Sequence, residues 1–193
     1  MKFIETTVRG AFVIELEKKE DPRGFFARSW CQKEFEAHGL VSRIAQANVS
    51  YNKYRGTLRG FHYQVEPYQE TKLIRCTRGA IHDVILDLRP DSPTYRQWVA
   101  VELRAEFYNM VYVPRGCANA FFILSDHTEA FYLSSEFYAP ECERGVRWND
   151  PAFGIAWPLA CAAIHERDAT YPDFDAAAHA REVARRGGWG APA

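Results

Sequence analysis

A histidine between two aromatic residues, close to two cations, is the feature of this sequence with the clearest chemical meaning. The segment Arg59–Gln64 reads RGFHYQ, and Lys72 follows ten residues after His62. Proton abstraction from an anionic substrate needs a base, together with cations that hold the anion and stabilise the developing charge. An imidazole, with a reference pKa near 6.5, suits the role of base at neutral pH. His62, Arg59 and Lys72 are therefore candidates for one site.

The elements that must position these residues are predicted to be mostly strands. Polarity alternates over residues 73–89 around a turn at Arg78-Gly79, as expected of strands with two different faces. One face carries Ile81, Asp83, Ile85, Asp87 and Arg89, and the other carries His82, Val84, Leu86 and Leu88. Further short apolar runs between turn signals are Trp98–Leu103, Asn109–Val113 and Ala118–Leu124, with Thr128–Ser134 expected as their partner. This spacing favours an antiparallel barrel or sandwich.

Helices are predicted at only two places. One lies near Gln32–His38 and would end at Gly39, and the other runs from about Phe174 to Arg186, before a pair of glycines. The chain of 193 residues has no internal repeat and no linker. We expect a single domain over residues 1–186 and a loose tail over residues 187–193.

Bulk composition argues against several classes of partner. The formal net charge is −1 and the pI is about 6.6, which does not favour a nucleic-acid surface or an acidic tail. The segment Lys2–Glu5 is too charged for a signal peptide, and no apolar run approaches membrane-spanning length. The five cysteines are scattered without a CxxC pair. We expect a soluble cytoplasmic protein with reduced thiols.

Sequence motifs of other enzyme classes are missing. The chain has no GxGxxG motif, no P-loop and no GxSxG elbow, so nicotinamide-dependent and serine-hydrolase chemistry have little support. A small barrel with a histidine near a strand end is typical of cupins, which often bind a metal ion. A metal-binding cupin would need histidines where this chain has Gln64 and Asn119. A first-row metal would thus lack its usual ligands, and we expect no metal and no cofactor.

Several segments together carry a specific family resemblance, which covers roughly residues 1–172. In chain order they are Asp21–Phe26, Gln46–Ser50, Gly56–Gln64, Lys72–Cys76, Asp83-Val84, Asp87–Arg89, Ser92–Thr94, Tyr132, Tyr138–Glu141, Trp148–Pro151, Ile155–Pro158 and Arg167-Asp168. With these segments the chain resembles the dTDP-4-dehydrorhamnose 3,5-epimerase family of metal-free cupins. The resemblance implies a mainly β, jelly-roll cupin fold with few short helices, and an isomerase that needs no cofactor.

The resemblance also implies a reaction and the roles of four residues. A 4-keto group acidifies the protons at C3 and C5 of a nucleotide-linked 6-deoxy sugar. Loss of either proton gives an enolate, and reprotonation from the opposite face inverts the centre. By resemblance, His62 is the base, Asp168 fixes its tautomer, Tyr132 is the acid on the other face, and Lys72 stabilises the enolate oxygen.

Binding residues follow from the same resemblance. Arg59, Arg23 and Arg167 are expected at the diphosphate, because guanidinium groups match phosphate oxygens. Neutral polar contacts are expected from Gln46 and Asn48, and stacking faces from Phe26 and Tyr138. In the family the Arg23–Phe26 segment reaches the site of the neighbouring subunit, which implies a homodimer.

Two positions depart from the family pattern. Arg28 stands where the family usually has a glutamate in the base-binding region, and Asn119 stands where it commonly has a histidine that lines the substrate pocket. An amide forms hydrogen bonds but supplies no titrating proton near neutral pH. The alternatives are therefore a CDP- or GDP-linked substrate, a 3- or 5-mono-epimerase, a ketoisomerase, or a sugar-binding cupin without catalysis.

Each candidate residue also has an ordinary structural interpretation. His62 would then be a core histidine, Lys72 an edge-strand lysine, Tyr132 a core tyrosine and Asp168 a turn cap. His82 shares its face with apolar residues, which favours a structural role. The histidines expected to be peripheral are His38, His127, His165 and His179.

Overall fold

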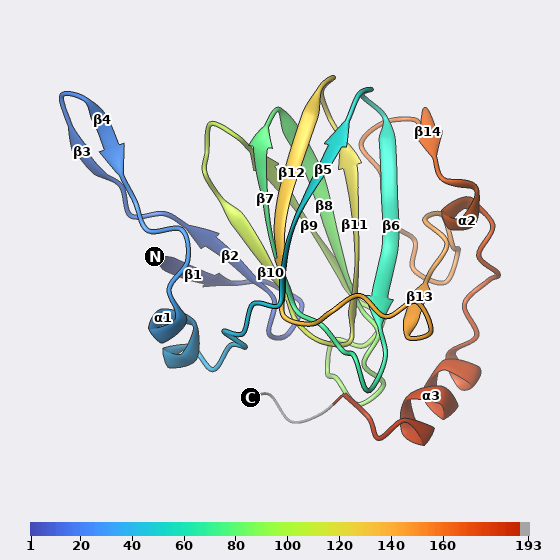
Figure 1. Cartoon of the computed structure of the whole chain (residues 1–193). Helices are drawn as coiled ribbons and strands as arrows, with labels where there is room; N and C mark the ends of the chain where they lie inside the picture. Colours follow the sequence, from blue (N-terminus) through green and yellow to red (C-terminus); the bar gives the residue numbers. More distant parts are fainter. Residues whose placement is uncertain (190–193) are drawn as a thin grey trace.

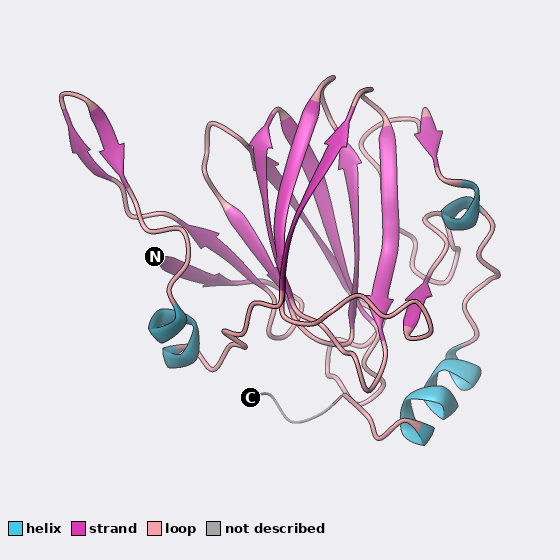
Figure 2. Cartoon of the chain, viewed as in Figure 1, coloured by secondary structure: helices cyan, strands magenta, loops and turns pink. Residues whose placement is uncertain are grey.

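The computed structural model describes residues 1–189, and these residues form mainly β-strands with a few short helices (Figure 2). In chain order the elements are β1 Lys2–Glu5, β2 Phe12–Glu15, β3 Lys19–Asp21, β4 Gly24–Phe26, α1 Gln32–Ala37, β5 Gln46–Asn52, β6 Thr57–Gln64, β7 Lys72–Arg78, β8 Ala80–Asp87, β9 Trp98–Arg104, β10 Met110–Val113, β11 Cys117–Ile123, β12 Thr128–Ser134, β13 Glu143–Gly145, β14 Ala163–Ile164, α2 Glu166–Ala169 and α3 Ala176–Arg185. The mainly β cupin fold expected from the sequence is confirmed.

Within the described residues, two large sheets lie face to face and form the barrel (Figure 1). The first sheet has the strand order β1-β2-β10-β7-β12-β5. The second has the order β13-β6-β11-β8-β9, with β14 pairing in parallel to β6. The expectation that Thr128–Ser134 pairs with the preceding runs is wrong, because β12 pairs with β5 and β7. The chain changes sheets after β11, so β11 and β12 are neighbours in sequence but are not paired.

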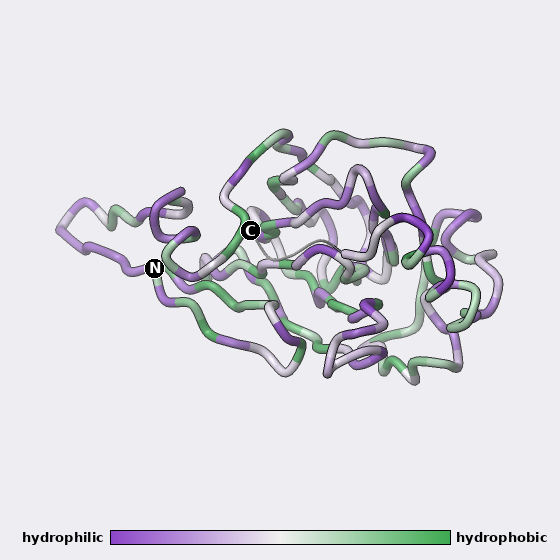
Figure 3. Tube along the Cα trace, turned by 90° about the horizontal axis from the view of Figure 1, so that it is seen from below, coloured by the Kyte–Doolittle hydropathy of each residue, from purple (hydrophilic) through white to green (hydrophobic). Residues whose placement is uncertain are grey.

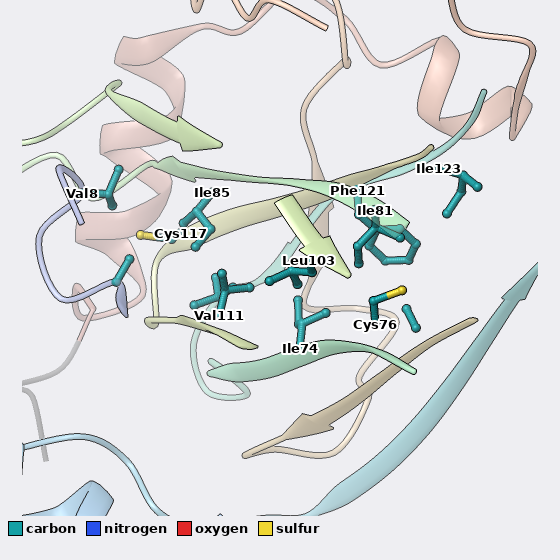
Figure 4. Close-up of a cluster of buried hydrophobic side chains, with 13 residues drawn as sticks. Val8, Ile74, Cys76, Ile81, Ile85, Leu103, Val111, Cys117, Phe121 and Ile123 are labelled. Carbon is teal, nitrogen blue, oxygen red and sulfur yellow. The ribbon is translucent and has the colours of Figure 1, made fainter. Parts of the chain in front are cut away.

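Apolar side chains from alternate positions of the strands fill the space between the sheets. Figure 4 shows this cluster, which includes Ile74, Ile81, Ile85, Val111 and Phe121. The residues between Ile81 and Ile85 obey the predicted alternation: Val84 lies on the opposite face of β8, in a second cluster. The space between the sheets is thus filled mainly by apolar side chains.

The C-terminal segment covers the outer face of the second sheet. Helix α3 follows the side-chain cap of Asp175 and buries His179 and Val183. The imidazole Nε2 of His179 lies 2.6 Å from the carbonyl of Leu88, so the expectation that His179 is peripheral is wrong. Trp189 stacks near the same imidazole, while residues 190–193 of the expected loose tail lie outside the described residues.

Helix predictions were correct for α1 and α3 and missed α2. Gly39 adopts a φ of +68° directly after α1, which agrees with its expected role as a helix stop. Helix α2 has only four residues, too few to show a helical period in the sequence. It nevertheless carries Arg167 and Asp168, and it therefore matters for the site.

The cysteines and the helices bear on two further expectations. None of the five cysteines forms a disulfide in the described part of the chain. Burial raises the pKa of the Cys76 thiol to about 11, which keeps it protonated at neutral pH. Among residues 1–189 no helix combines the length and apolar character that a membrane crossing requires.

Candidate active site

Two cavities between the sheets share the side chains of His62, Lys72 and Tyr132. The larger has a volume of about 780 Å³ and the smaller about 350 Å³. Additional predicted site residues in the larger cavity are Arg59, Asn119, Arg167 and Asp168, and those in the smaller are Gln46, Asn48 and Tyr138. The structure thus brings most of the predicted site residues to one connected region.

A β-bulge in β6 lets Arg59 and His62 reach the same cavity. Residues three positions apart face opposite sides of a regular strand. Here β11 advances two residues, from Asn119 to Phe121, while β6 advances three, from His62 to Arg59. Gly60 makes this possible: its φ is +113°, and a Cβ at this position would lie 2.5 Å from the carbonyl oxygen of Asn119.

Asp168 contacts His62 directly. The His62 Nε2 lies 2.8 Å from Oδ1 of Asp168, and the backbone amide of Gly60 donates to Oδ2 at 3.3 Å. Burial disfavours the charged carboxylate, but the hydrogen bond with His62 and the nearby charges outweigh it and hold the pKa of Asp168 below its ordinary value. A carboxylate can only accept, so Nε2 carries the proton and Nδ1 is the nitrogen left to act as a base.

Tyr132 and Lys72 reach the cavity from the other sheet. Tyr132 lies on β12 and Lys72 on β7, whereas His62 lies on β6. The Lys72 Nζ is 3.1 Å from Oε1 of Glu70, whose other oxygen accepts from Ser134 at 2.7 Å. A ring placed between the sheets would therefore meet the imidazole on one side and the phenol on the other.

Glu143 is a cavity residue that sequence reasoning missed. It lies on β13, and its carboxylate accepts from both terminal nitrogens of Arg167, at 2.6 and 3.2 Å, and from the Tyr138 hydroxyl at 2.8 Å. Arg167 also lies 3.0 Å from the protonated Nε2 of His62, which cannot accept from it. Glu143 follows the Pro140-Glu141 turn and belongs to no motif with a recognisable spacing, so the sequence alone did not identify it as a site residue.

Asp83 and Asn52 were also missed as supports of the site. Asp83 is fully buried behind Asn119, and burial raises its pKa to about 7. Its Oδ1 accepts from the Asn119 amide at 2.8 Å. Asn52, on β5, accepts from Nε of Arg59 at 2.6 Å and so links Arg59 to the first sheet. Alternation placed Asp83 on the same face of its strand as Ile81 and Ile85, but only the structure shows its partner.

The predicted binding residues in and just after the β3–β4 hairpin lie apart from both cavities. Strands β3 and β4 extend away from the barrel, as two views show (Figure 1, Figure 3). Phe26 is 72% exposed, Arg23 pairs with Asp21, and Arg28 pairs with Glu34 at 2.9 Å. Within one chain, these residues do not contribute to the site.

His165, expected to be peripheral, lines the larger cavity. Its Nδ1 accepts from the backbone amide of Arg167 at 3.2 Å and caps α2. By contrast, Gln64 has a structural role: its amide donates to the carbonyl groups of Tyr68 and Phe137. Among the described residues, no group of three or more His, Cys, Asp and Glu side chains could hold a metal ion.

The half-buried His62–Asp168 pair, at a cavity that Tyr132 lines from the opposite sheet of a cupin barrel, is the arrangement expected of cupin isomerases that work by proton transfer. The sequence profile of dTDP-4-dehydrorhamnose 3,5-epimerase matches residues 5–176, and the chain belongs to this family.

Individual relatives agree with this assignment. The Shigella flexneri dTDP-4-dehydrorhamnose 3,5-epimerase is 40% identical over 87% of this chain and 93% of its own length. The crystal structure of the Bacillus anthracis dTDP-4-dehydrorhamnose 3,5-epimerase, with TDP and PPi bound, has a TM-score of 0.85 at 40% identity and covers 90% of this chain and 99% of its own. A Streptomyces niveus dTDP-4-dehydrorhamnose 3-epimerase is 38% identical over 83% of this chain and 78% of its own length.

Proposed function

We propose that this chain epimerises a nucleotide-linked 4-keto-6-deoxy sugar at C3 and C5, and that one domain over residues 1–186 carries the activity. The observation that carries the proposal is the position of His62 and Tyr132, which face one cavity from opposite sheets. Inversion needs a proton to leave one face of the ring and another to arrive on the other face. Tyr132 and His62 supply the acid and the base in that geometry.

The remaining roles follow from charge. Asp168 holds the proton on Nε2 of His62 and stabilises the imidazolium that forms when Nδ1 takes a proton from the sugar. Lys72 lines the cavity, and its ammonium group is assigned the role of stabilising the negative charge that develops on the enolate oxygen. Arg59 and Arg167 offer guanidinium groups to the diphosphate. No redox step is involved, because the proton removed and the proton added leave the oxidation state unchanged.

We infer that dTDP is the nucleotide carried by the substrate, as the names of the relatives indicate for those proteins. Arg28 argues for a different base, but its guanidinium is paired with Glu34. A third cavity, separate from the two in the barrel, is lined by Phe26 and Arg28 and also by the carboxylates of Glu17 and Glu34. Acceptors for a base N–H are therefore present beside the aromatic ring. CDP and GDP remain the alternatives to be tested.

The active unit in this proposal is a homodimer in which the β3–β4 hairpin completes the partner's site. The supporting observation is that Arg23 and Phe26 are exposed at the end of a hairpin that projects from its own barrel (Figure 1). Phe26 is the most exposed of the large apolar side chains among the described residues, and Phe25 beside it is also exposed, so the hairpin presents apolar surface that a partner subunit can cover. We also propose a cytoplasmic location, supported by cysteines that form no disulfide among the described residues.

Inversion of one centre only is the second candidate function. The observation that favours it is Asn119, which lines the larger cavity and is not a titrating group. One of the relatives is named as a 3-epimerase. The two candidates differ in how many sugar positions lose and regain a proton.

Proton NMR in heavy water tests the proposal. The enzyme is incubated with a dTDP-linked 4-keto-6-deoxy sugar, and the loss of the C3 and C5 proton signals is followed. Exchange at both carbons with inversion supports the 3,5-epimerase, and exchange at one carbon supports the mono-epimerase. Absence of exchange with dTDP-, CDP-, GDP- and UDP-linked sugars would overturn both.

His62→Ala is the matched variant for this experiment. Loss of the general base should slow exchange by about 100- to 10,000-fold. Binding of dTDP, measured as a rise in melting temperature, should survive because the arginines are unchanged. Near-normal exchange in the variant would show that another group is the base.

A further inference from the structure

The side-chain amide of Asn119 has one possible orientation. Its nitrogen end lies 2.8 Å from Oδ1 of Asp83 and 3.4 Å from the carbonyl oxygen of Val84. A carbonyl oxygen only accepts, so the group that faces it must be the NH₂ of the amide. Both N–H groups are thereby directed into the barrel wall, away from the cavity.

The carbonyl oxygen of the same amide, Oδ1, has no donor from the protein among the described residues. Asn119 lines the larger cavity and is only 5% exposed, and its Oδ1 has no hydrogen-bond donor among residues 1–189. The fully covered side-chain atoms that lack a partner do not include this Oδ1, so it is accessible from the cavity, where an O–H or N–H group of a ligand can donate to it. The cavity therefore presents a hydrogen-bond acceptor at this point, to which a donor group of a ligand can bind.

The position of this acceptor relative to the base is set by the sheet. Asn119 is the register partner of His62 on the adjacent strand, and both side chains line the same cavity. Directly paired residues have Cβ atoms about 4.5–5.5 Å apart. A group that contacts Asn119 is consequently attached close to the carbon whose proton His62 removes.

We propose that Asn119 is a specificity-determining residue whose Oδ1 accepts a hydrogen bond from a ring hydroxyl of the sugar, and that Asp83 is the positioning residue that fixes the amide. The inference rests on the proposed function. A keto oxygen cannot donate, so this arrangement turns the 4-keto group away from Asn119 and toward the ammonium of Lys72, which also lines the cavity. The Asn119 amide thus determines the orientation in which the sugar ring binds.

A cycle between enzyme variant and substrate analogue tests the hydroxyl contact. Wild type and Asn119→Ala are compared on the full substrate and on its 2-deoxy and 3-deoxy analogues, with deuterium exchange at C5 as the common readout. On the full substrate the variant should lose about tenfold in kcat/KM, the size expected for one hydrogen bond. On the analogue that lacks the contacted hydroxyl this tenfold loss should disappear, which leaves at most a loss that is common to all three substrates.

The cycle also separates this contact from damage to the fold. Removing the partner of Asp83 affects all substrates alike, so it cancels in the comparison. An equal loss on all three substrates would overturn the inference. A wild-type enzyme without exchange on any nucleotide sugar would overturn the proposed function itself, so the two failures are distinguishable.

Two substitutions of Asp83 test the positioning role. Asp83→Asn keeps an acceptor for the Asn119 amide and should retain the preference for the full substrate over the deoxy analogue. Asp83→Leu removes the acceptor, lets the amide turn, and should reduce that preference to the level of Asn119→Ala. Unchanged discrimination in a folded Asp83→Leu protein would overturn the positioning role, and if this variant does not fold, loss of discrimination in folded Asp83→Asn would do so.

Discussion

The chemistry of this site depends on which nitrogen of His62 carries the proton. Asp168 settles this by accepting from Nε2, and its carboxylate is in turn held by the amide of Gly60. Arg167 approaches the same imidazole but is occupied by Glu143. The cation beside the pair favours an ionised Asp168, which is the form that can hold the Nε2 proton.

Tyr132→Phe should separate exchange from inversion. His62 and Lys72 remain in the variant, so the enolate still forms, but it is reprotonated by the imidazole on the same face. We expect recovered substrate to gain deuterium faster than product appears, since a phenol with a reference pKa near 10 is the acid that the variant lacks. Mass and NMR analysis of substrate and product over time measures both rates. Equal reductions in exchange and inversion would assign the opposite-face acid to another group.

Chelation should leave the activity unchanged. Gln64 is committed to two backbone carbonyls and Asn119 to Asp83, so neither position offers the imidazole that a metal-binding cupin uses. Epimerisation rates before and after dialysis against EDTA test this. A loss that one divalent ion restores would contradict the expectation.

At the scale of single residues, the sequence was informative where a family motif exists. The segments around His62, Lys72, Tyr132 and Asp168 were recognisable, and the structure brings all four to the larger cavity. Glu143 and Asp83 were not recognisable as site residues, because each acts through a partner that is distant in sequence. Asp83 lies 36 positions from Asn119, and no local pattern encodes that contact.

At the scale of elements, the β6 bulge is the device that assembles the site. It brings Arg59 and His62, whose spacing is odd, to the same face of one strand. The conformation depends on a glycine in a region of φ that other residues rarely adopt.

Gly60→Ala should therefore destabilise the fold and disrupt the site together. Strain at φ +113° and the clash with Asn119 should lower the free energy of unfolding by about 3 kcal/mol or more, and kcat/KM should fall even where the protein is folded. Gly154→Ala is the matched control, because Gly154 also has a positive φ, +58°, but nothing lies within 4 Å of an added Cβ. The control should cost about 1 kcal/mol and keep its activity. Similar activities in the two variants, measured alongside urea unfolding, would contradict this role of the bulge.

Strand positions were predictable because alternation between two buried faces leaves a clear pattern, as in Ile81 to Leu86 on β8. The bulge, the pairing of β12 and helix α2 were not predictable from that pattern. Each depends on contacts between segments far apart in the chain, and α2 is a single turn held by the cap from His165. Local periodicity identifies strands but not their neighbours.

At the scale of the whole molecule, the proposed dimer makes a prediction that a single chain cannot satisfy. A His62→Ala chain has an intact hairpin, and an Arg23→Ala/Phe26→Ala chain has an intact cavity. Each homodimer should be nearly inactive, but a mixed dimer has one site with both parts intact. After equal mixing and subunit exchange, about a quarter of the wild-type activity should return.

The control for this experiment mixes each variant with itself. Recovery should also depend on exchange of subunits, so activity measured before exchange should remain low. If the mixture stays at the level of its components after exchange is complete, the hairpin does not act in the partner's site.

The bulge has a further consequence for what the enzyme accepts. Because Arg59 and His62 lie on one strand, the backbone holds their Cα atoms no more than about 10 Å apart, the length of three residues of a strand. Strand β6 therefore fixes the distance between these two residues. In the proposed function Arg59 binds the diphosphate and His62 removes the proton, so β6 would set the distance between the phosphates and the reacting carbon, and a sugar without the diphosphate would lack that anchor. The nucleotide would then take no part in the proton transfer, but it would contribute to substrate selection through this fixed distance.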